Sequence, residues 1–272
     1  MTFKAAAIQM NSTNDMLANI RNASMLIKEA AAAGATLITL PENATFMAAN
    51  IDELRANAYL MEEHPAIDIF KTVAQTLKVD ILIGSMAVKL AYSKKLANRS
   101  VMIDREGNVI AHYDKIHMYD ATVQGGESHK ESARFEAGKQ PVLVQLPECK
   151  LGLTICYDLR FPYLYRHLAR EGAEVITAPS AFTHFTGGAH WEVLLRARAI
   201  ENSCYMIAAA QTGVHPANRK TYGHAMIVDP WGTVIADAGG DEEGFAIAEI
   251  DTARVHKIRD EIPSLKNGVS LF

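Results

Sequence analysis

Short apolar segments alternate with amphipathic helical segments in this chain, and this alternation restricts the possible folds more than any other feature. Residues 3–9 form an apolar segment typical of a buried strand, residues 14–33 carry apolar side chains at helical spacing, and residues 35–40 are again apolar. The same order returns over residues 151–178. Strands that are apolar on both faces need helices to cover the sheet. The sequence therefore predicts an α/β fold.

The number of sheets is not decided by periodicity. About a dozen short strands are expected, and some, such as residues 98–104 and 109–113, are joined by tight turns into hairpins. Two sheets packed face to face with helices outside and a single doubly wound sheet both accommodate them. The chain has no Pro-, Gly- or Ser-rich linker and no internal repeat. We therefore expect one domain over residues 1–272.

Composition and charge indicate which broad classes of protein this chain does not resemble. The chain is 49% hydrophobic and 21% charged, which is typical of a soluble globular protein, and no apolar segment approaches the length of a membrane span. A formal charge of −4 gives no reason to expect nucleic acid or an anionic membrane as a partner. The N-terminus lacks the character of a signal peptide, and three cysteines without paired spacing do not indicate disulfides. A reducing, cytoplasmic location is expected.

Cys156 lies where a strand, a tight turn and a helix follow one another. The alternating pattern of residues 151–155 ends at Cys156, and Pro162 suits the first position of a helix. A thiol at this junction would lie near free backbone N–H groups, which favour the thiolate that attacks carbon. We therefore take Cys156 as a candidate nucleophile. The alternative is a small, buried, unreactive side chain.

Two further polar residues share this placement. Glu42 and Lys115, like Cys156, lie at or just beyond the C-terminal end of an expected strand, where sites gather in mixed α/β folds. Together they offer a base, a cation for a developing oxyanion and a nucleophile. The backbone N–H of Tyr157 is a candidate second oxyanion donor. The alternative for Glu42 and Lys115 is an ordinary charged side chain on the surface.

A cysteine–histidine pair is the competing arrangement. Five histidines are available for it: His112, His117, His184, His190 and His224. Spacing does not single out one of them. The chain has no H-E-x-x-H or paired C-x-x-C motif for a metal, and no G-x-G-x-x-G motif or P-loop for phosphates.

Three motifs resemble the three signatures of the nitrilase superfamily, the carbon–nitrogen hydrolases. They are LPE at residues 40–42, YDKIHMYD at residues 113–120 and ICYDLRFP at residues 155–162. Their order and separation match as well, and the likeness covers nearly the whole chain. The resemblance implies an α–β–β–α sandwich, with two sheets packed face to face and helices on the outside.

The resemblance also implies a Glu–Lys–Cys triad that works without a metal or an organic cofactor. Glu42 would be the general base, Lys115 would stabilise the tetrahedral intermediate, and Cys156 would be acylated. A second glutamate in the loop between lysine and cysteine helps to position the substrate and the lysine in that family. Glu131 matches it best, and Glu127 in the same loop is the rival.

Residues 179–202 and 222–236 resemble the Nit-type amidases, and most closely the deaminated-glutathione amidases. This likeness implies hydrolysis of a small carboxylated amide, such as deaminated glutathione or α-ketoglutaramate, to acid and ammonia through a cysteine thioester. Related carbamoylases bind a substrate carboxylate through an arginine at the position of Arg160, although Arg160 could equally form a structural salt bridge at the helix start.

Other readings stay open at this stage. A nitrilase or an N-carbamoyl amide hydrolase of the same superfamily is the first alternative, and a non-enzymatic binding protein on this fold is a remote one. Family resemblance further implies a homodimer or a higher homo-oligomer, for which the helix at residues 191–202 is the candidate interface. That helix could instead face the core and expose only its arginines.

Overall fold

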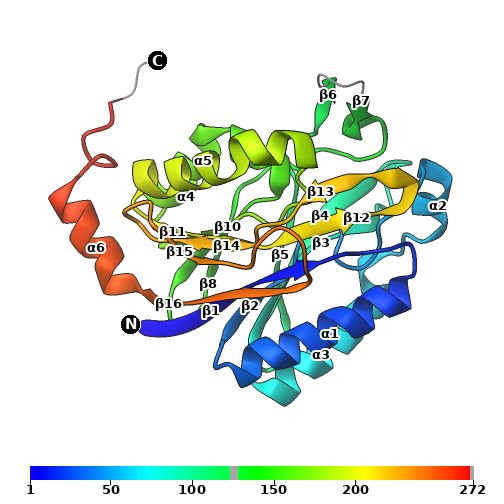
Figure 1. Ribbon diagram of the computed structural model, residues 1–272, viewed down its shortest axis with the longest axis horizontal. Helices are drawn as coiled ribbons and strands as arrows, with labels where there is room; N and C mark the ends of the chain where they lie inside the picture. The colour runs from blue at the N-terminus through cyan, green and yellow to red at the C-terminus, as the bar shows by residue number, and fades with distance from the viewer. Residues whose placement is uncertain (123–127, 270–272) are drawn as a thin grey trace.

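The computed structural model describes residues 1–122 and 128–269, and it shows two β-sheets stacked between two layers of helices (Figure 1). The strands are β1 (Thr2–Met10), β2 (Leu37–Thr39), β3 (Asp80–Lys89), β4 (Leu96–Ile103), β5 (Val109–Asp114), β6 (Asp120–Thr122), β7 (Ser128–Lys130), β8 (Val142–Gln145), β9 (Lys150–Leu153), β10 (Val175–Thr177), β11 (Tyr205–Ala208), β12 (Ala210–Val214), β13 (Lys220–Tyr222), β14 (Met226–Val228), β15 (Val234–Asp237) and β16 (Gly244–Asp251). The α-helices are α1 (Met16–Ala32), α2 (Ile51–Ala56), α3 (Pro65–Leu77), α4 (Pro162–Arg170), α5 (His184–Asn202) and α6 (Thr252–Glu261). The 3₁₀ helices are η1 (Met61–Glu63), η2 (Glu131–Ala133), η3 (Cys156–Arg160) and η4 (Pro216–Asn218).

The two main sheets are both mixed. The first has the order β13-β12-β1-β2-β3-β4-β5, with β16 also paired antiparallel along β1, and the second has the order β15-β14-β11-β10-β9-β8. Parallel pairs lie at the centre of each sheet, at β1-β2-β3 and at β9-β10-β11, and antiparallel pairs lie toward the edges. The structure thus selects two sheets over the single doubly wound sheet.

Strand β1 shows why these residues form a buried central strand. Its side chains alternate between two apolar environments, so both of its faces are covered. Ala5 and Ala7 belong to the core between the two sheets, whereas Ala6 and Ile8 belong to the core beneath α1 and α3. The chain is therefore apolar at successive positions rather than at every second one.

Helices cover the outer face of each sheet. In Figure 1, α1 and α3 lie below the first sheet, and α4 and α5 lie above the second. Trp191, Leu195 and Ala199 of α5 are fully buried in the core that contains the second sheet. The predicted α–β–β–α sandwich is confirmed. None of the helices in the described ranges is long and apolar enough to cross a bilayer.

Two local expectations are wrong. The glycines at 187 and 188 suggest a bend before a helix at residues 190–202, but α5 already begins at His184. A Cβ atom on Gly187 would lie 2.3 Å from the Tyr222 side chain, so this glycine serves close packing inside a helix. The polar-rich composition of residues 50–63 favours a helix over that whole segment, but α2 ends at Ala56, and Tyr59 then forms a β-bridge with Val88.

Candidate active site

Glu42 lies in a tight turn just after β2. The turn presses against β3, where a Cβ atom on Gly84 would lie 1.9 Å from the Leu40 carbonyl oxygen, so only glycine fits there. Gln211 of β12 donates its side-chain N–H to the Glu42 carbonyl oxygen at 3.0 Å. These contacts from two neighbouring strands hold the buried Glu42 side chain at the end of the first sheet.

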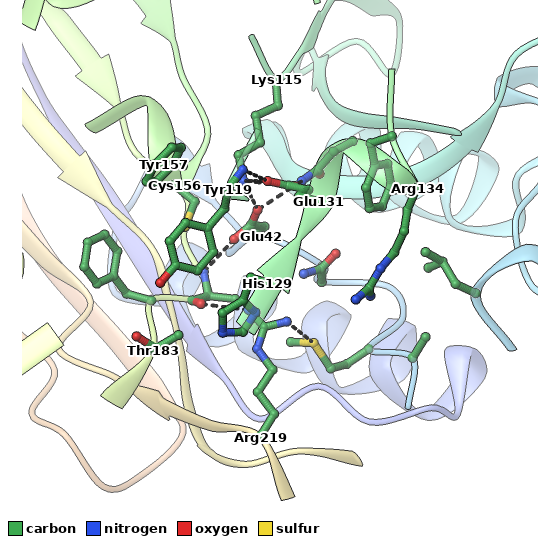
Figure 2. A pocket seen from close by; sticks show the side chains of 18 of the residues that line it. Glu42, Lys115, Tyr119, His129, Glu131, Arg134, Cys156, Tyr157, Thr183 and Arg219 are labelled. Carbon is green, nitrogen blue, oxygen red and sulfur yellow. Dashed lines mark hydrogen bonds and ion pairs between the residues drawn. The ribbon is translucent and has the colours of Figure 1, made fainter. Parts of the chain in front are cut away.

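Lys115 directly follows β5, and its ammonium group lies between two carboxylates (Figure 2). The side chain is 2% exposed, and Nζ is 3.0 Å from Oε1 of Glu42 and 2.9 Å from Oε2 of Glu131. Asn98 of β4 donates its side-chain N–H to both carboxylates, at 3.0 and 3.1 Å. An ammonium group has three N–H donors, so two carboxylates leave one donor for another acceptor.

Cys156 begins η3, shortly after strand β9 of the second sheet ends at Leu153. Its φ angle of 46° is uncommon for a residue other than glycine, and its backbone N–H donates to the Pro179 carbonyl oxygen at 3.0 Å. This sharp turn directs the thiol into the pocket that Glu42 also lines. The three residues at three strand ends thus meet in one pocket.

The buried carboxylate of Asp158 joins the lysine segment to the cysteine turn. It accepts hydrogen bonds from the Ile155 N–H at 2.9 Å, the Tyr113 hydroxyl at 2.8 Å and the His117 N–H at 3.0 Å. Buried carboxylates of this kind are stable only when several donors satisfy them. Asp158 therefore fixes the two sequence motifs relative to each other without entering the pocket.

Electrostatics place the negative charge on Glu42 rather than on the sulfur. Burial would raise the pKa of Glu42, but Lys115 and Arg219 lower it to about 2. Burial raises the pKa of the Cys156 thiol, and the neighbouring Glu42 raises it further against the opposing effect of Lys115. Burial would lower the pKa of Lys115, but Glu131 and Glu42 raise it well above the ordinary value. The expected resting thiolate is therefore wrong, because burial of the thiol and the neighbouring Glu42 carboxylate together outweigh the effect of Lys115.

The pKa values of the three thiols do not distinguish the three cysteines, because all three are raised. Burial also raises the pKa of Cys149 and of Cys204, in each case to about 12. Both thiols are packed in the hydrophobic core, whereas the half-buried Cys156 lines the pocket beside Glu42 and Lys115. Geometry alone singles out Cys156.

Arg160 lies on the wall of the same pocket. Its guanidinium group is 5.3 Å from the Phe182 ring centre and 5.9 Å from that of Tyr157, and its Nη atoms are 3.3 Å from Nδ1 of His190. No carboxylate of the described residues pairs with it. The salt-bridge alternative for Arg160 therefore finds no support in residues 1–122 and 128–269.

Of the two glutamates predicted as supporting residues, Glu131 contacts Lys115 directly. Glu131 begins η2, and its carboxylate accepts the Tyr119 N–H at 2.6 Å as well as the bonds from Lys115 and Asn98. Glu127 lies outside the described residues. The sequence of residues 116–140 is polar and contains glycines, which predicts a long surface loop. Within it, residues 116–122 and 128–135, which we call the arm, instead contain the β6–β7 hairpin and carry Glu131 into the site.

Sequence reasoning missed three contributors to the site. Asn98 bridges the two carboxylates, the Ala181 N–H donates to Oε2 of Glu42 at 2.9 Å, and Arg219 donates to the Ala181 carbonyl oxygen at 3.0 Å. Asn98 left only a weak signal, because Arg99 and Ser100 follow it and the strand is polar over three successive residues. The other two leave none, since a backbone N–H and an arginine in a polar loop have no distinctive pattern.

The histidine alternative does not fit the geometry. None of the five candidate histidines lines the pocket that holds Cys156, and His129 of the arm is the histidine that does. Within the described residues, no three or more His, Cys, Asp or Glu side chains are grouped as metal ligands would be. Around Cys156, the available proton acceptor is a carboxylate.

This combination of sandwich fold and Glu, Lys and Cys side chains in one pocket defines a class of hydrolases. The carbon–nitrogen hydrolase family model matches residues 4–260. The chain belongs to the carbon–nitrogen hydrolase family, which confirms the resemblance seen in the three motifs.

Similar proteins cover almost the whole chain. It is 44% identical over 271 residues to the deaminated glutathione amidase of Synechocystis sp. PCC 6803, with 98% of both chains covered. It is 39% identical over 267 residues to the deaminated glutathione amidase of Mus musculus, covering 95% of this chain and 80% of the relative. The crystal structure of the C. elegans NitFhit protein superposes with a TM-score of 0.90 and 36% identity, covering 98% of this chain and 65% of that longer chain.

Proposed function

We propose that this protein hydrolyses a small carboxylated amide through a Cys156 thioester, with Glu42 as general base and acid and Lys115 as the oxyanion-stabilising cation. The observation that carries the proposal is the single pocket in which the Cys156 thiol lies beside the Glu42 carboxylate and the buried Lys115 ammonium group. Glu131 is proposed as the supporting carboxylate that holds Lys115 in place.

Acylation follows from the resting protonation state. The Cys156 sulfur attacks the amide carbon while its proton passes to Glu42, because the low pKa of the carboxylate disfavours transfer before attack. The negative charge moves to the amide oxygen, which accepts the remaining N–H of Lys115 and the N–H of Tyr157. Tyr157 is the second residue of η3, where backbone N–H groups lack an acceptor within the helix.

Breakdown of the intermediate uses the same groups in reverse. The carbon–nitrogen bond breaks, and Glu42 gives its proton to the leaving nitrogen. A water molecule then loses a proton to Glu42 and attacks the thioester carbon. The carbon–sulfur bond breaks, the sulfur recovers the proton from Glu42, and the free acid leaves. Amide and water are consumed, and acid and amine are formed.

The pocket suits an anionic substrate. Five cationic side chains line it, namely Lys115, Lys130, Arg134, Arg160 and Arg219, and only Lys115 is paired with carboxylates of the described residues. Two relatives are named deaminated glutathione amidase. We propose deaminated glutathione as the substrate and Arg160 as the ligand of its α-keto acid carboxylate.

This substrate changes the expected product. The amide nitrogen of deaminated glutathione belongs to cysteinylglycine, so hydrolysis releases that dipeptide and α-ketoglutarate. Ammonia leaves only from a primary amide such as α-ketoglutaramate. The release of α-ketoglutarate therefore reports both reactions, whereas an ammonia assay misses the first.

The test compares substrates and cysteine variants. Wild-type protein is expected to form α-ketoglutarate from deaminated glutathione, and Cys156→Ala is expected to lose at least about a thousandfold in kcat/KM. Cys204→Ala is the control, because it removes a thiol that lies outside the pocket, and it should retain activity. Faster conversion of aliphatic nitriles or N-carbamoyl acids would favour the sister hydrolases. No turnover of any of these compounds, with normal folding, would favour a binding protein.

We further propose that the chain is one catalytic domain that works as a homodimer in the cytoplasm, where Cys156 stays reduced. The interface lies on α5, although Trp191 itself faces the core. Phe185, Val193 and Ile200 form a stripe on the outer face, each more than half exposed. We expect Val193→Glu to convert dimer to monomer in light scattering at micromolar concentration. Val214→Glu, at another exposed valine on β12, should stay dimeric. A monomeric wild type would exclude the dimer.

A further inference from the structure

The pocket has a second cationic end that the reaction at Cys156 does not use. Arg134, in the arm just after η2, and Arg219, just after η4, both line it, and Figure 2 shows their side chains reaching into it from two sides. Arg160 lines the wall formed by Tyr157 and Phe182. The cations of the pocket therefore come from separate segments.

Neither of these two guanidinium groups forms an ion pair with a carboxylate of the described residues, although Arg219 is near enough to Glu42 to lower its pKa. Arg219 is half-buried, donates to the Ala181 carbonyl oxygen at 3.0 Å and lies 3.6 Å from the Met47 sulfur, neither of which is a carboxylate. Its buried Nε has no hydrogen-bond partner among the described residues. Arg134 makes no ion pair with a carboxylate of those residues. Arginines that line a pocket without a carboxylate partner among the described residues are suited to an anionic ligand.

We propose that Arg134 and Arg219 form a second carboxylate site, which binds the carboxylate of the leaving group. This inference rests on the proposed function. Deaminated glutathione carries a carboxylate at each end, with the reactive amide between them. Arg160 holds the α-keto acid end, and Arg134 with Arg219 holds the glycine carboxylate of the cysteinylglycine half. A fork-shaped guanidinium group is suited to bidentate binding of a carboxylate.

This second site makes the pocket selective for long substrates with two carboxylates. α-Ketoglutaramate has the same acyl half, but its leaving group is ammonia, which offers nothing to Arg134 or Arg219. The same holds for deaminated glutathione in which the glycine carboxylate is converted to a methylamide. The methylamide differs from the natural compound by one charge at one end, so it isolates the contribution of the second site.

The experiment measures α-ketoglutarate release from deaminated glutathione and from its methylamide by wild type, Arg134→Gln and Arg219→Gln. Wild type should prefer the free acid by about tenfold to a hundredfold in kcat/KM, which is the value of a charged hydrogen bond. Each variant should reduce this preference severalfold, through KM for the free acid. Arg21→Gln, which removes an exposed charge from α1, should keep the full preference.

The ratio separates the possible outcomes. Arg219 also holds the Ala181 peptide that donates to Glu42, so Arg219→Gln can slow both substrates, but an effect through Ala181 leaves the ratio unchanged. An unchanged ratio in both variants, or a wild type indifferent to the glycine charge, overturns the second site and leaves the amidase proposal intact. A wild type that cleaves neither compound refutes the amidase proposal and this inference together.

Discussion

The strand ends and the arm contribute to the same pocket in different ways. Glu42, Lys115 and Cys156 leave the ends of strands in two packed sheets, and Glu42 and Lys115 are each less than 5% exposed. The arm forms the β6–β7 hairpin, bridges Leu96 of β4 through Phe135, and offers Glu131 to the buried lysine and Arg134 to the pocket. The first region is held by two sheets, and the second by one hairpin, one bridge and a small apolar cluster around Phe135.

The difference separates two tasks. Groups that transfer protons and form bonds must keep their geometry within fractions of an ångström, so they are placed on rigid elements. Groups that recognise a substrate can lie on a segment that varies in length and composition without disturbing the core. The arginine of the arm, which has no ion pair among the described residues, and the lysine of the strand ends, which has two, reflect this division.

The strongest way to break the strand-end site is to remove the charge of Glu42. Glu42→Gln keeps the shape but cannot accept the Cys156 proton, so we expect kcat to fall by about a hundredfold to ten-thousandfold, the usual contribution of a general base. Steady-state kinetics on deaminated glutathione measure it. Glu106→Gln, an exposed glutamate in the β4–β5 turn, is the control for loss of one charge. Activity of Glu42→Gln within tenfold of wild type would contradict the assignment.

Glu42→Gln should also change how the free energy of unfolding depends on pH. The folded pKa of Glu42, about 2, lies below the ordinary value of 4.5, so its ionised form stabilises the fold above pH 4.5. This contribution, roughly 3 kcal/mol at most, is lost as the pH falls from 4.5 toward 2. Denaturant unfolding at several pH values should show wild type losing its advantage over Glu42→Gln across that window. A difference independent of pH would mean that Glu42 is not held ionised.

The two regions also differ in how far the sequence predicts them. Glu42, Lys115 and Cys156 were predictable because each interrupts an apolar strand pattern, and a strand end is a defined place in an α/β fold. The sandwich itself required family resemblance, since periodicity allows one sheet or two. Asn98, the Ala181 N–H and Arg219 were missed because their roles depend on which strands lie side by side. The protonation of Cys156 was predicted wrongly because the distance to Glu42 is a tertiary property.

The smallest and most informative effect is expected in the arm. Glu131→Gln leaves Lys115 paired with Glu42 through the 3.0 Å contact, so the ammonium group keeps a partner but loses its second one. We expect kcat to fall about tenfold, less than for Glu42→Gln, because the lysine is less well placed rather than absent. Glu136→Gln, in the chain just after the arm and outside the pocket, is the matched control and should stay close to wild type.

A pH profile distinguishes positioning from a merely structural loss. Glu131 and Glu42 together raise the pKa of Lys115 against burial, so removal of Glu131 must lower it. The alkaline decline of kcat should therefore begin at lower pH in Glu131→Gln than in wild type, whereas loss of folded protein would reduce the rate equally at every pH. If the decline does not move, Glu131 is not the partner that keeps Lys115 charged, and the arm contributes to recognition alone.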